Sequence, residues 1–226
     1  RHNDLNHLEK RLIETSAKGC RYICVESVYS TDGSIAPLKD FCALAKRYRA
    51  QLIIDEAHAV GVIGPEGKGL ISALELEKEI FAMVATFGKG PGTYGAIVLG
   101  SVILKEFLIN FARPVIYTTA LPFYNLTGIE CSYALFPNLE NERRHIHKLI
   151  KIFRNAYPEA SMTHIQSIKV KGNQQAIEAS QHLAEKGFDV RALLSPTVRR
   201  GQERLRVCLH AFNTEEEVKA LLTGMD

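Results

Sequence analysis

Residues 51–70, QLIIDEAHAVGVIGPEGKGL, begin with a nearly all-apolar run that ends in the tetrad Asp55-Glu56-Ala57-His58. An apolar run without polar alternation predicts a strand buried on both faces, which is typical of a parallel sheet covered by helices. The tetrad therefore puts a carboxylate and an imidazole where a buried strand ends. In α/β folds this edge of the sheet is where ligands bind.

The same alternation continues on both sides of this stretch. Short apolar runs predict strands, and apolar residues three or four positions apart predict helices. Asn3 or Asp4 can cap the first helix, and Gly19 is expected to end it. The predicted order is helix, strand, helix, strand, helix, strand, over residues 3–19, 20–28, 37–49, 51–57, 69–79 and 80–87. This order predicts an α/β fold with a mostly parallel sheet covered by helices.

The pattern changes near Pro122. A long helix is predicted over residues 122–157, although Pro137 should divide it. The remaining elements are predicted as strand, helix, strand and strand over residues 164–172, 173–186, 188–194 and 204–212, with a final helix after Thr214. We expect two domains: the C-terminal part of a large α/β domain over 1–121, and a linking helix with a smaller α+β domain over 122–226.

Composition and charge exclude several classes of protein. The chain has 226 residues, 46% of them hydrophobic and 23% charged, which is an ordinary globular composition. Its 28 basic and 25 acidic residues form no basic stripe, so a nucleic-acid partner is not favoured. No apolar run reaches the length of a membrane span. Five cysteines form no C-x-x-C pair: Cys20, Cys24, Cys42, Cys131 and Cys208. Most of them sit in apolar runs, so we expect most to be reduced core thiols, in a cytoplasmic protein.

The tetrad at residues 55–58 also occurs in nucleic-acid helicases, where an acidic pair holds Mg²⁺. A helicase needs a P-loop, G-x-x-x-x-G-K-[ST], whose amides bind phosphates. Gly67-Lys68 is the nearest candidate, but Gly69 follows it, and Val62 stands where the first glycine belongs. A helicase is therefore disfavoured. An isolated D-x-x-H is better explained by an Asp and a His that cap the next loop or pair with each other, so a functional role depends on the residues found around it.

Lys89 lies in a glycine-rich loop, VATFGKGPGTYG over residues 84–95, directly after an apolar strand. Its side chain and that of Asp55 would leave the C-terminal ends of strands in one parallel sheet. Three interpretations are open: a solvated surface cation, a cation that binds phosphate, or an amine that holds pyridoxal 5'-phosphate (PLP) as a Schiff base.

PLP would account for several side chains together. Its pyridine nitrogen needs a carboxylate, which Asp55 can supply, and its phenolic oxygen needs a donor, for which His58 is suited. Its phosphate needs hydroxyls and amides, and Thr86 and Ser30 are candidates. Either hydroxyl alone is explained equally well by turn or strand chemistry.

Six blocks of the sequence together resemble the α-oxoamine synthases, a family of fold-type I PLP enzymes. The most specific are DEAHAVGVIGPEGKG (residues 55–69) and TFGKGPGTYGAIVLGS (residues 86–101). The others follow the family's order: HNDLNHLE, VESVYSTDGSIAPL, FARPVIYTTALP and SPTVRRGQERLRVCLHA. The resemblance covers essentially the whole chain. It implies part of a fold-type I PLP-transferase large domain, followed by the smaller C-terminal α+β domain.

The resemblance implies roles for individual residues. Lys89 would form the Schiff base with PLP, and His58 would assist catalysis as the donor to the phenolic oxygen. Asp55 would pair with the pyridine nitrogen, Ser30 would bond near the ring, and Thr86 would bind the phosphate.

Other matched positions imply a second subunit and a substrate site. Thr118 and Thr119 would reach the phosphate held by a neighbouring subunit, which implies a homodimer with shared active sites. Thr197 matches a substrate contact, and Arg206 would pair with the carboxylate of an amino acid. On spacing alone, Arg206 would be a charge on a strand surface. Some relatives carry an arginine where this chain has Leu194, so a carboxylate contact there is lost or falls to Arg206.

The implied activity is a decarboxylative condensation of an amino acid with an acyl thioester. The block FARPVIYTTALP favours the branch that joins L-alanine to a pimeloyl thioester of coenzyme A or an acyl carrier protein, in biotin biosynthesis. A glycine C-acetyltransferase, a serine palmitoyltransferase and a non-catalytic module of this fold are the alternatives. The family's N-terminal part, which stacks a side chain on the cofactor ring, is absent before Arg1, so a molecule that begins there is expected to be inactive.

Overall fold

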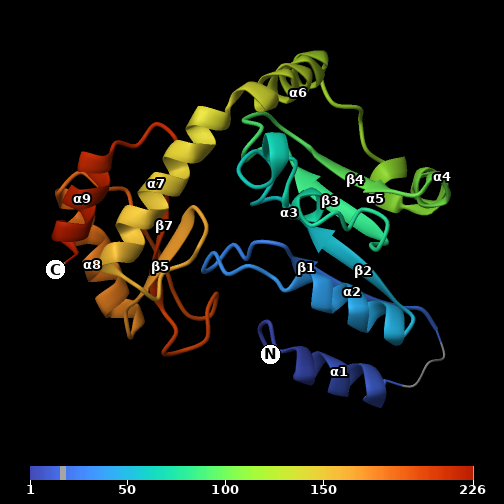
Figure 1. The fold of residues 1–226 in the computed structure, drawn as a ribbon, viewed down its shortest axis with the longest axis horizontal. Coiled ribbons are helices and arrows are strands. Elements are labelled where there is room, and N and C mark those ends of the chain that lie inside the picture. The colour runs from blue at the N-terminus through green and yellow to red at the C-terminus, as the bar shows by residue number, and fades with distance from the viewer. Residues whose placement is uncertain (16–18, 226) are drawn as a thin grey trace. The chain divides into compact units, whose positions relative to one another are not determined.

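The computed structural model describes residues 1–15 and 19–225, and its contacts divide the chain into two compact units. The units are residues 1–28 with 36–139, and residues 29–35 with 140–226. Figure 1 shows the helices and strands of each unit. The division follows Leu139, whereas the sequence predicted a boundary after residue 121. A short segment from the N-terminal half belongs to the second unit.

The first unit is built on a four-stranded sheet in the order β1-β2-β3-β4. The strands span Arg21–Glu26, Ala50–Asp55, Ala82–Thr86 and Ala96–Gly100. β1, β2 and β3 run parallel, and β4 pairs antiparallel with β3. Asp55, at the end of β2, is in register with Glu26 on one side and Val84 on the other. The mostly parallel α/β sheet that the apolar runs predict is confirmed.

Two helices of the first unit follow the predicted amphipathic patterns. α1 (Leu5–Glu14) is capped by Asp4, whose carboxylate accepts a backbone N–H of the first turn at 2.9 Å. It ends five residues before the predicted Gly19. α2 (Leu38–Arg47) packs against β2 and buries the apolar side of its surface, formed by Leu38, Phe41, Cys42 and Ala45.

The helix predicted over residues 69–79 is reduced to one turn, α3 (Leu70–Ala73), which follows a short 3-10 turn at Pro65–Gly67. Glu75 adopts a left-handed φ of 57°, and the Leu76 N–H returns to a carbonyl of α3 at 3.1 Å. A left-handed residue ends a helix. The predicted helix was therefore wrong beyond its first turn.

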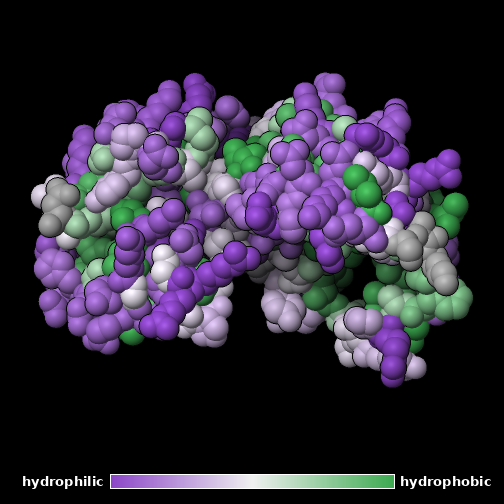
Figure 2. All heavy atoms as spheres, turned by 90° about the horizontal axis from the view of Figure 1, so that it is seen from below, coloured by the Kyte–Doolittle hydropathy of each residue, from purple (hydrophilic) through white to green (hydrophobic). Residues whose placement is uncertain are grey.

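Apolar surface is exposed along β4 and the helices that follow it. These helices are α4, α5 and α6, which span Val102–Phe111, Arg113–Ile116 and Phe123–Leu135. Ile103 and Phe123 are 82% and 83% exposed, and Val98 on β4 is 48% exposed. Figure 2 shows hydrophobic atoms reaching the surface on one face of the molecule. Residues 96–100 were not predicted as a strand, and the expectation that the predicted strands are buried on both faces is wrong for β1, where Tyr22 is 53% exposed.

The second unit combines an antiparallel sheet, in the order β5-β7-β6, with α7, α8 and α9. The strands β5, β6 and β7 span Ile165–Lys169, Arg191–Leu193 and Arg204–Cys208. The helices span Glu140–Ala156, Asn173–Glu185 and Glu215–Gly224. Pro137 lies in a 3-10 turn between α6 and α7, as its ring predicts. Thr214 and Glu217 form a capping box at the start of α9.

The cysteines agree only partly with the prediction. All five are free, but Cys42 alone of them is buried and Cys208 is half-buried, while three are exposed: Cys20, Cys24 and Cys131. Cys24 follows the buried Ile23 on β1, and successive strand residues point to opposite faces. The expectation of core thiols is therefore wrong for the exposed three.

The described residues include neither a membrane-spanning helix nor a metal-binding cluster. None of their helices has both the length and the apolarity needed to cross a membrane. Within the same residues, no group of three or more His, Cys, Asp and Glu side chains could hold a metal ion.

Candidate active site

The candidate site in the first unit lies where β2 and β3 end. Asp55 is the last residue of β2, Thr86 is the last residue of β3, and the two strands are parallel neighbours. Lys89 follows three residues later, in the turn that leads to β4. The structure thus places Asp55 and Thr86 at one edge of the sheet, with Lys89 in the turn that follows Thr86.

Asp55 begins a tight turn that carries His58. Its Oδ1 accepts the Ala57 N–H at 2.7 Å, and the Glu56 carbonyl accepts the Val60 N–H at 3.0 Å. These bonds fix the direction of the chain directly after β2, with His58 half-buried in the turn. Among the described residues Asp55 Oδ2 forms no hydrogen bond, so one carboxylate oxygen remains for a ligand.

Lys89 lies in a compact turn between β3 and β4. The Gly92 N–H closes the turn on the Lys89 carbonyl at 2.9 Å. A Cβ on Gly90 would stand 2.3 Å from the Val60 carbonyl oxygen, so the Lys89 turn packs directly on the turn after β2. Lys89 is exposed, and its amine forms no hydrogen bond or ion pair with the residues that the structure describes.

Thr86 gives an independent indication of a ligand. Its Oγ1 is buried and has no hydrogen-bond partner within the described part of the chain. Buried hydroxyls are usually paired, because an unpaired one costs roughly 1–3 kcal/mol. A hydroxyl of this kind, three residues before Lys89, can donate to an acceptor on a bound molecule.

Glu56 is a member of the tetrad whose importance the sequence analysis missed. Its side chain is fully buried, and Oε2 accepts the Ile71 N–H at 3.4 Å. Gly69 has a φ of 101°, and a Cβ there would lie 1.8 Å from Oε2, so glycine is required beside this carboxyl. Burial raises the pKa of Glu56, opposed by backbone hydrogen bonds from Ile71 and Leu70. The carboxyl joins the end of β2 to the start of α3.

Glu56→Gln should remove a pH dependence of stability. Because the pKa of Glu56 is raised in the folded chain, that chain binds the proton more tightly than the unfolded chain, whose glutamate pKa is about 4.3. The free energy of unfolding is therefore highest below that pH and falls as pH rises through the folded-state pKa. Glutamine keeps a hydrogen-bond acceptor but carries no charge. In the variant, the free energy of unfolding should therefore depend less on pH, and at alkaline pH it should be roughly 1 kcal/mol higher than in the wild type. Urea titrations across this range measure both effects, and an unchanged slope would contradict the assignment.

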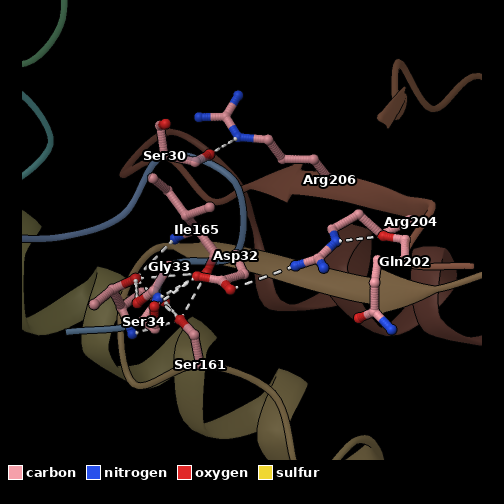
Figure 3. Close-up of polar contacts among 10 residues, drawn as sticks. Ser30, Asp32, Gly33, Ser34, Ser161, Ile165, Gln202, Arg204 and Arg206 are labelled. Carbon is pink, nitrogen blue, oxygen red and sulfur yellow. Dashed lines mark hydrogen bonds and ion pairs between the residues drawn. The ribbon is translucent and has the colours of Figure 1, made fainter. Parts of the chain in front are cut away.

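The second unit holds three other predicted site residues, Ser30, Thr197 and Arg206. Arg206, on β7, donates from Nε to the Ser30 carbonyl oxygen at 2.6 Å, as Figure 3 shows. Within the described residues Nε is the Arg206 atom that forms a hydrogen bond, so the two terminal nitrogens remain for a ligand. Thr197 is exposed in the loop after β6, where Asn173 bonds both the N–H and the carbonyl of Ser195.

Thr118 and Thr119 follow α5 on an exposed segment of the first unit. The Thr118 hydroxyl donates to the Thr119 carbonyl at 3.4 Å, which is a local contact. Their predicted target is a second subunit, so their role stays a prediction.

Asp32 and Arg204 were not singled out from the sequence. They form an ion pair in the second unit, with Arg204 Nη1 3.4 Å from Asp32 Oδ2. A signal was present in the letters RLR at residues 204–206, because alternate residues of a strand share a face. Arg204 therefore lies on the same side of β7 as Arg206.

The sequence is similar to a known protein family and to individual proteins over nearly its whole length. The model of the family "Aminotransferase class I and II" matches residues 1–224. The 8-amino-7-oxononanoate synthase of Methylobacillus flagellatus is 37% identical over 227 residues, which cover 98% of this chain and 57% of that protein. That of Marinobacter nauticus is also 37% identical, and 58% of its length is covered. The chain thus spans a little over half the length of these relatives.

Solved structures agree with the fold. Two matches are structures of serine palmitoyltransferase (SPT), one described as SPT with PLP and one from Sphingomonas wittichii. Each has a TM-score of 0.92 and 28% identity, over 100% of this chain and 58% of the matched chain. The 8-amino-7-oxononanoate synthase of Francisella tularensis matches with a TM-score of 0.85 and 29% identity, over 99% of this chain and 66% of that one.

Proposed function

Because the chain belongs to the aminotransferase class I and II family, we propose that the protein is a PLP-dependent α-oxoamine synthase acting on L-alanine and a pimeloyl thioester. The thioester is carried by coenzyme A or an acyl carrier protein, and the products are 8-amino-7-oxononanoate, CO₂ and the free thiol. The relatives with this activity in their names support the reaction. The observation that carries the proposal is the shared sheet edge of Asp55, Thr86 and Lys89.

The side chains at this edge fit PLP. The buried Thr86 hydroxyl, unpartnered among the described residues, would donate to the phosphate. Asp55 has an oxygen for the pyridine nitrogen, and Lys89 has an uncommitted amine for the cofactor's carbonyl carbon. His58, in the turn after β2, would donate to the phenolic oxygen, and Ser30 would bond near the ring.

PLP, when bound, withdraws electrons from the substrate carbon beside the amino nitrogen. Asp55 would keep the pyridine nitrogen protonated, which makes that withdrawal effective. The Lys89 amine would take the proton from this carbon and later return one. His58 would donate a hydrogen bond to the thioester oxygen on which negative charge develops during the attack.

Arg206 would bind the carboxylate of the amino acid. A guanidinium fork matches a carboxylate in shape, and such charge-assisted bonds are roughly twice as strong as neutral ones. Its two terminal nitrogens are uncommitted among the described residues. Leu194 carries no charge, so the carboxylate contact that some relatives make at that position would fall to Arg206, while Thr197 would contact the substrate.

The proposal includes a cytoplasmic homodimer in which Thr118 and Thr119 of one subunit complete the phosphate site of the other. The exposed apolar side chains of α4 and α6 support an interface, because a patch of this kind is seldom left in water. Five free cysteines support a reducing compartment. Sedimentation of the full chain measures the number of subunits.

A substrate panel separates this reaction from its alternatives. L-alanine, glycine and L-serine are each offered with pimeloyl, acetyl and palmitoyl thioesters to the full chain loaded with PLP, and products are identified by mass. Preference for alanine with the pimeloyl thioester supports the proposal. Preference for serine with the palmitoyl thioester would assign the protein to the branch that the SPT structures favour. If the protein shows the absorbance of bound PLP but forms no product from any combination of amino acid and thioester, a non-catalytic module would be favoured.

Thr86→Val should have opposite effects on the cofactor-free protein and on PLP binding. Valine keeps the shape and removes a buried unpaired hydroxyl, so without PLP the free energy of unfolding should stay equal or rise by about 1 kcal/mol. The phosphate loses a donor, so the Kd for PLP should rise roughly tenfold. Thermal unfolding and absorbance titration measure the two effects. A variant that binds PLP as tightly as the wild type would remove Thr86 from the phosphate site.

A further inference from the structure

The segment Tyr29–Ile35 forms a tight turn that belongs to the second unit. The Gly33 N–H bonds the Tyr29 carbonyl at 2.8 Å, and the Tyr29 N–H bonds the Ser34 carbonyl at 2.9 Å. Gly33 has a φ of 71°, and a Cβ there would lie 2.0 Å from the Ile165 carbonyl oxygen. The turn is therefore pressed against the start of β5, with no room for a side chain at its tip.

Asp32 connects this turn to β7. Its Oδ1 accepts the Ser34 N–H at 3.0 Å and the Ser34 hydroxyl at 2.7 Å, while Oδ2 pairs with Arg204 Nη1 at 3.4 Å. Arg204 Nε is in turn bonded to the Gln202 carbonyl at 3.0 Å. The side chains of Arg204 and Asp32 are 10% and 26% exposed, so water screens this pair less than an ion pair on the surface.

Arg204 and Arg206 hold the turn from one face of β7, as Figure 3 shows. Leu205, between them, points to the opposite face and is 3% exposed. Arg206 Nε bonds the carbonyl of Ser30, two residues before the Asp32 that Arg204 holds. With Nε occupied, the guanidinium presents its two terminal nitrogens as a pair, which is one of the geometries that fit a carboxylate.

We propose that Asp32 and Arg204 are positioning residues for Arg206: their ion pair fixes the turn whose Ser30 carbonyl orients the guanidinium for a substrate carboxylate. This inference rests on the proposed function, because that function assigns Arg206 to the carboxylate of the amino acid. It adds that affinity for the amino acid depends on two side chains that do not touch it. Removing the pair would let the turn and the Ser30 carbonyl move, and Arg206 would lose its fixed direction.

Asp32→Asn and Arg204→Gln test the inference in the full chain loaded with PLP. We expect the Kd for L-alanine, followed through the cofactor absorbance, and the KM for L-alanine to rise roughly 3- to 30-fold. The KM for the thioester should not change. Asp32→Glu keeps the charge and should recover most of the affinity. The double variant should bind no more weakly than the weaker single variant, because the two residues form one pair.

Asp189→Asn is the matched control. It breaks an ion pair with Arg191 on the neighbouring β6, whose two side chains are both 78% exposed. Asp189→Asn should leave the Kd and the KM for L-alanine unchanged. Amide hydrogen exchange in Tyr29–Ile35 should accelerate in Asp32→Asn but not in Asp189→Asn. A pair that only stabilises the fold would lower the melting temperature and leave the Kd of the folded protein unchanged, which would overturn the inference. A wild-type protein that binds no amino acid would overturn the proposed function as well.

Discussion

Lys89→Ala is expected to reduce turnover by roughly 10⁴-fold or more, because its amine would both hold the cofactor and move the substrate proton. Lys89 is exposed and its amine has no partner among the described residues, so the free energy of unfolding should change by less than about 0.5 kcal/mol. Borohydride reduction in the presence of PLP should add one cofactor mass to the wild type and none to the variant. Intact mass after reduction measures this directly.

Lys10→Ala provides the control for this experiment. Lys10 lies exposed on α1 and pairs with Glu14 at 3.8 Å, far along the chain from the candidate site. Its removal should leave turnover and the mass gain unchanged. A Lys89→Ala protein that still gains one cofactor on reduction would refute the assignment of the lysine, whatever its rate.

The features of the site that the sequence predicted are those that depend on single strands. An apolar run followed by Asp55, and another followed by a glycine loop with Lys89, determine where side chains leave a parallel sheet. β2 and β3 are parallel neighbours, as the two apolar runs predict, and Asp55 is in register with Val84. The roles of Lys89, His58 and Asp55 toward a cofactor stay predictions, and so do those of the hydroxyl groups.

The features that the sequence did not predict depend on contacts between distant segments. The periodicity of residues 69–79 indicated a helix, but Glu75 adopts a left-handed backbone conformation that ends the helix early. The apolar pattern of a sequence does not predict such a backbone angle. Glu56 looked like part of a motif, although its burial depends on the close approach of Gly69. The pairing of Asp32 with Arg204 joins residues far apart in the chain, so spacing could not reveal it.

Gly90→Ala should destabilise the protein by roughly 2–3 kcal/mol, because the added methyl overlaps backbone that cannot easily move. Its Cβ would lie 2.3 Å from the Val60 carbonyl oxygen and 3.3 Å from the Val60 carbonyl carbon. Relief requires that the Lys89 turn lift away from the turn that carries His58. We therefore also expect less covalent cofactor per folded molecule after borohydride reduction. Urea unfolding and intact mass measure the two effects.

Gly88→Ala tests whether this effect comes from the contact or from the loss of a flexible glycine. Gly88 lies on the other side of Lys89, and its nearest neighbour would be the Thr93 carbonyl oxygen at 3.6 Å, an ordinary contact. Alanine at a position without strain restricts the unfolded chain and commonly stabilises by about 0.4–1 kcal/mol. The two variants should therefore move stability in opposite directions although they flank the same lysine. If both variants lost the same amount of stability, both glycines would be needed for the flexibility of the loop. The packing of the two turns against each other would then not explain how Lys89 is held.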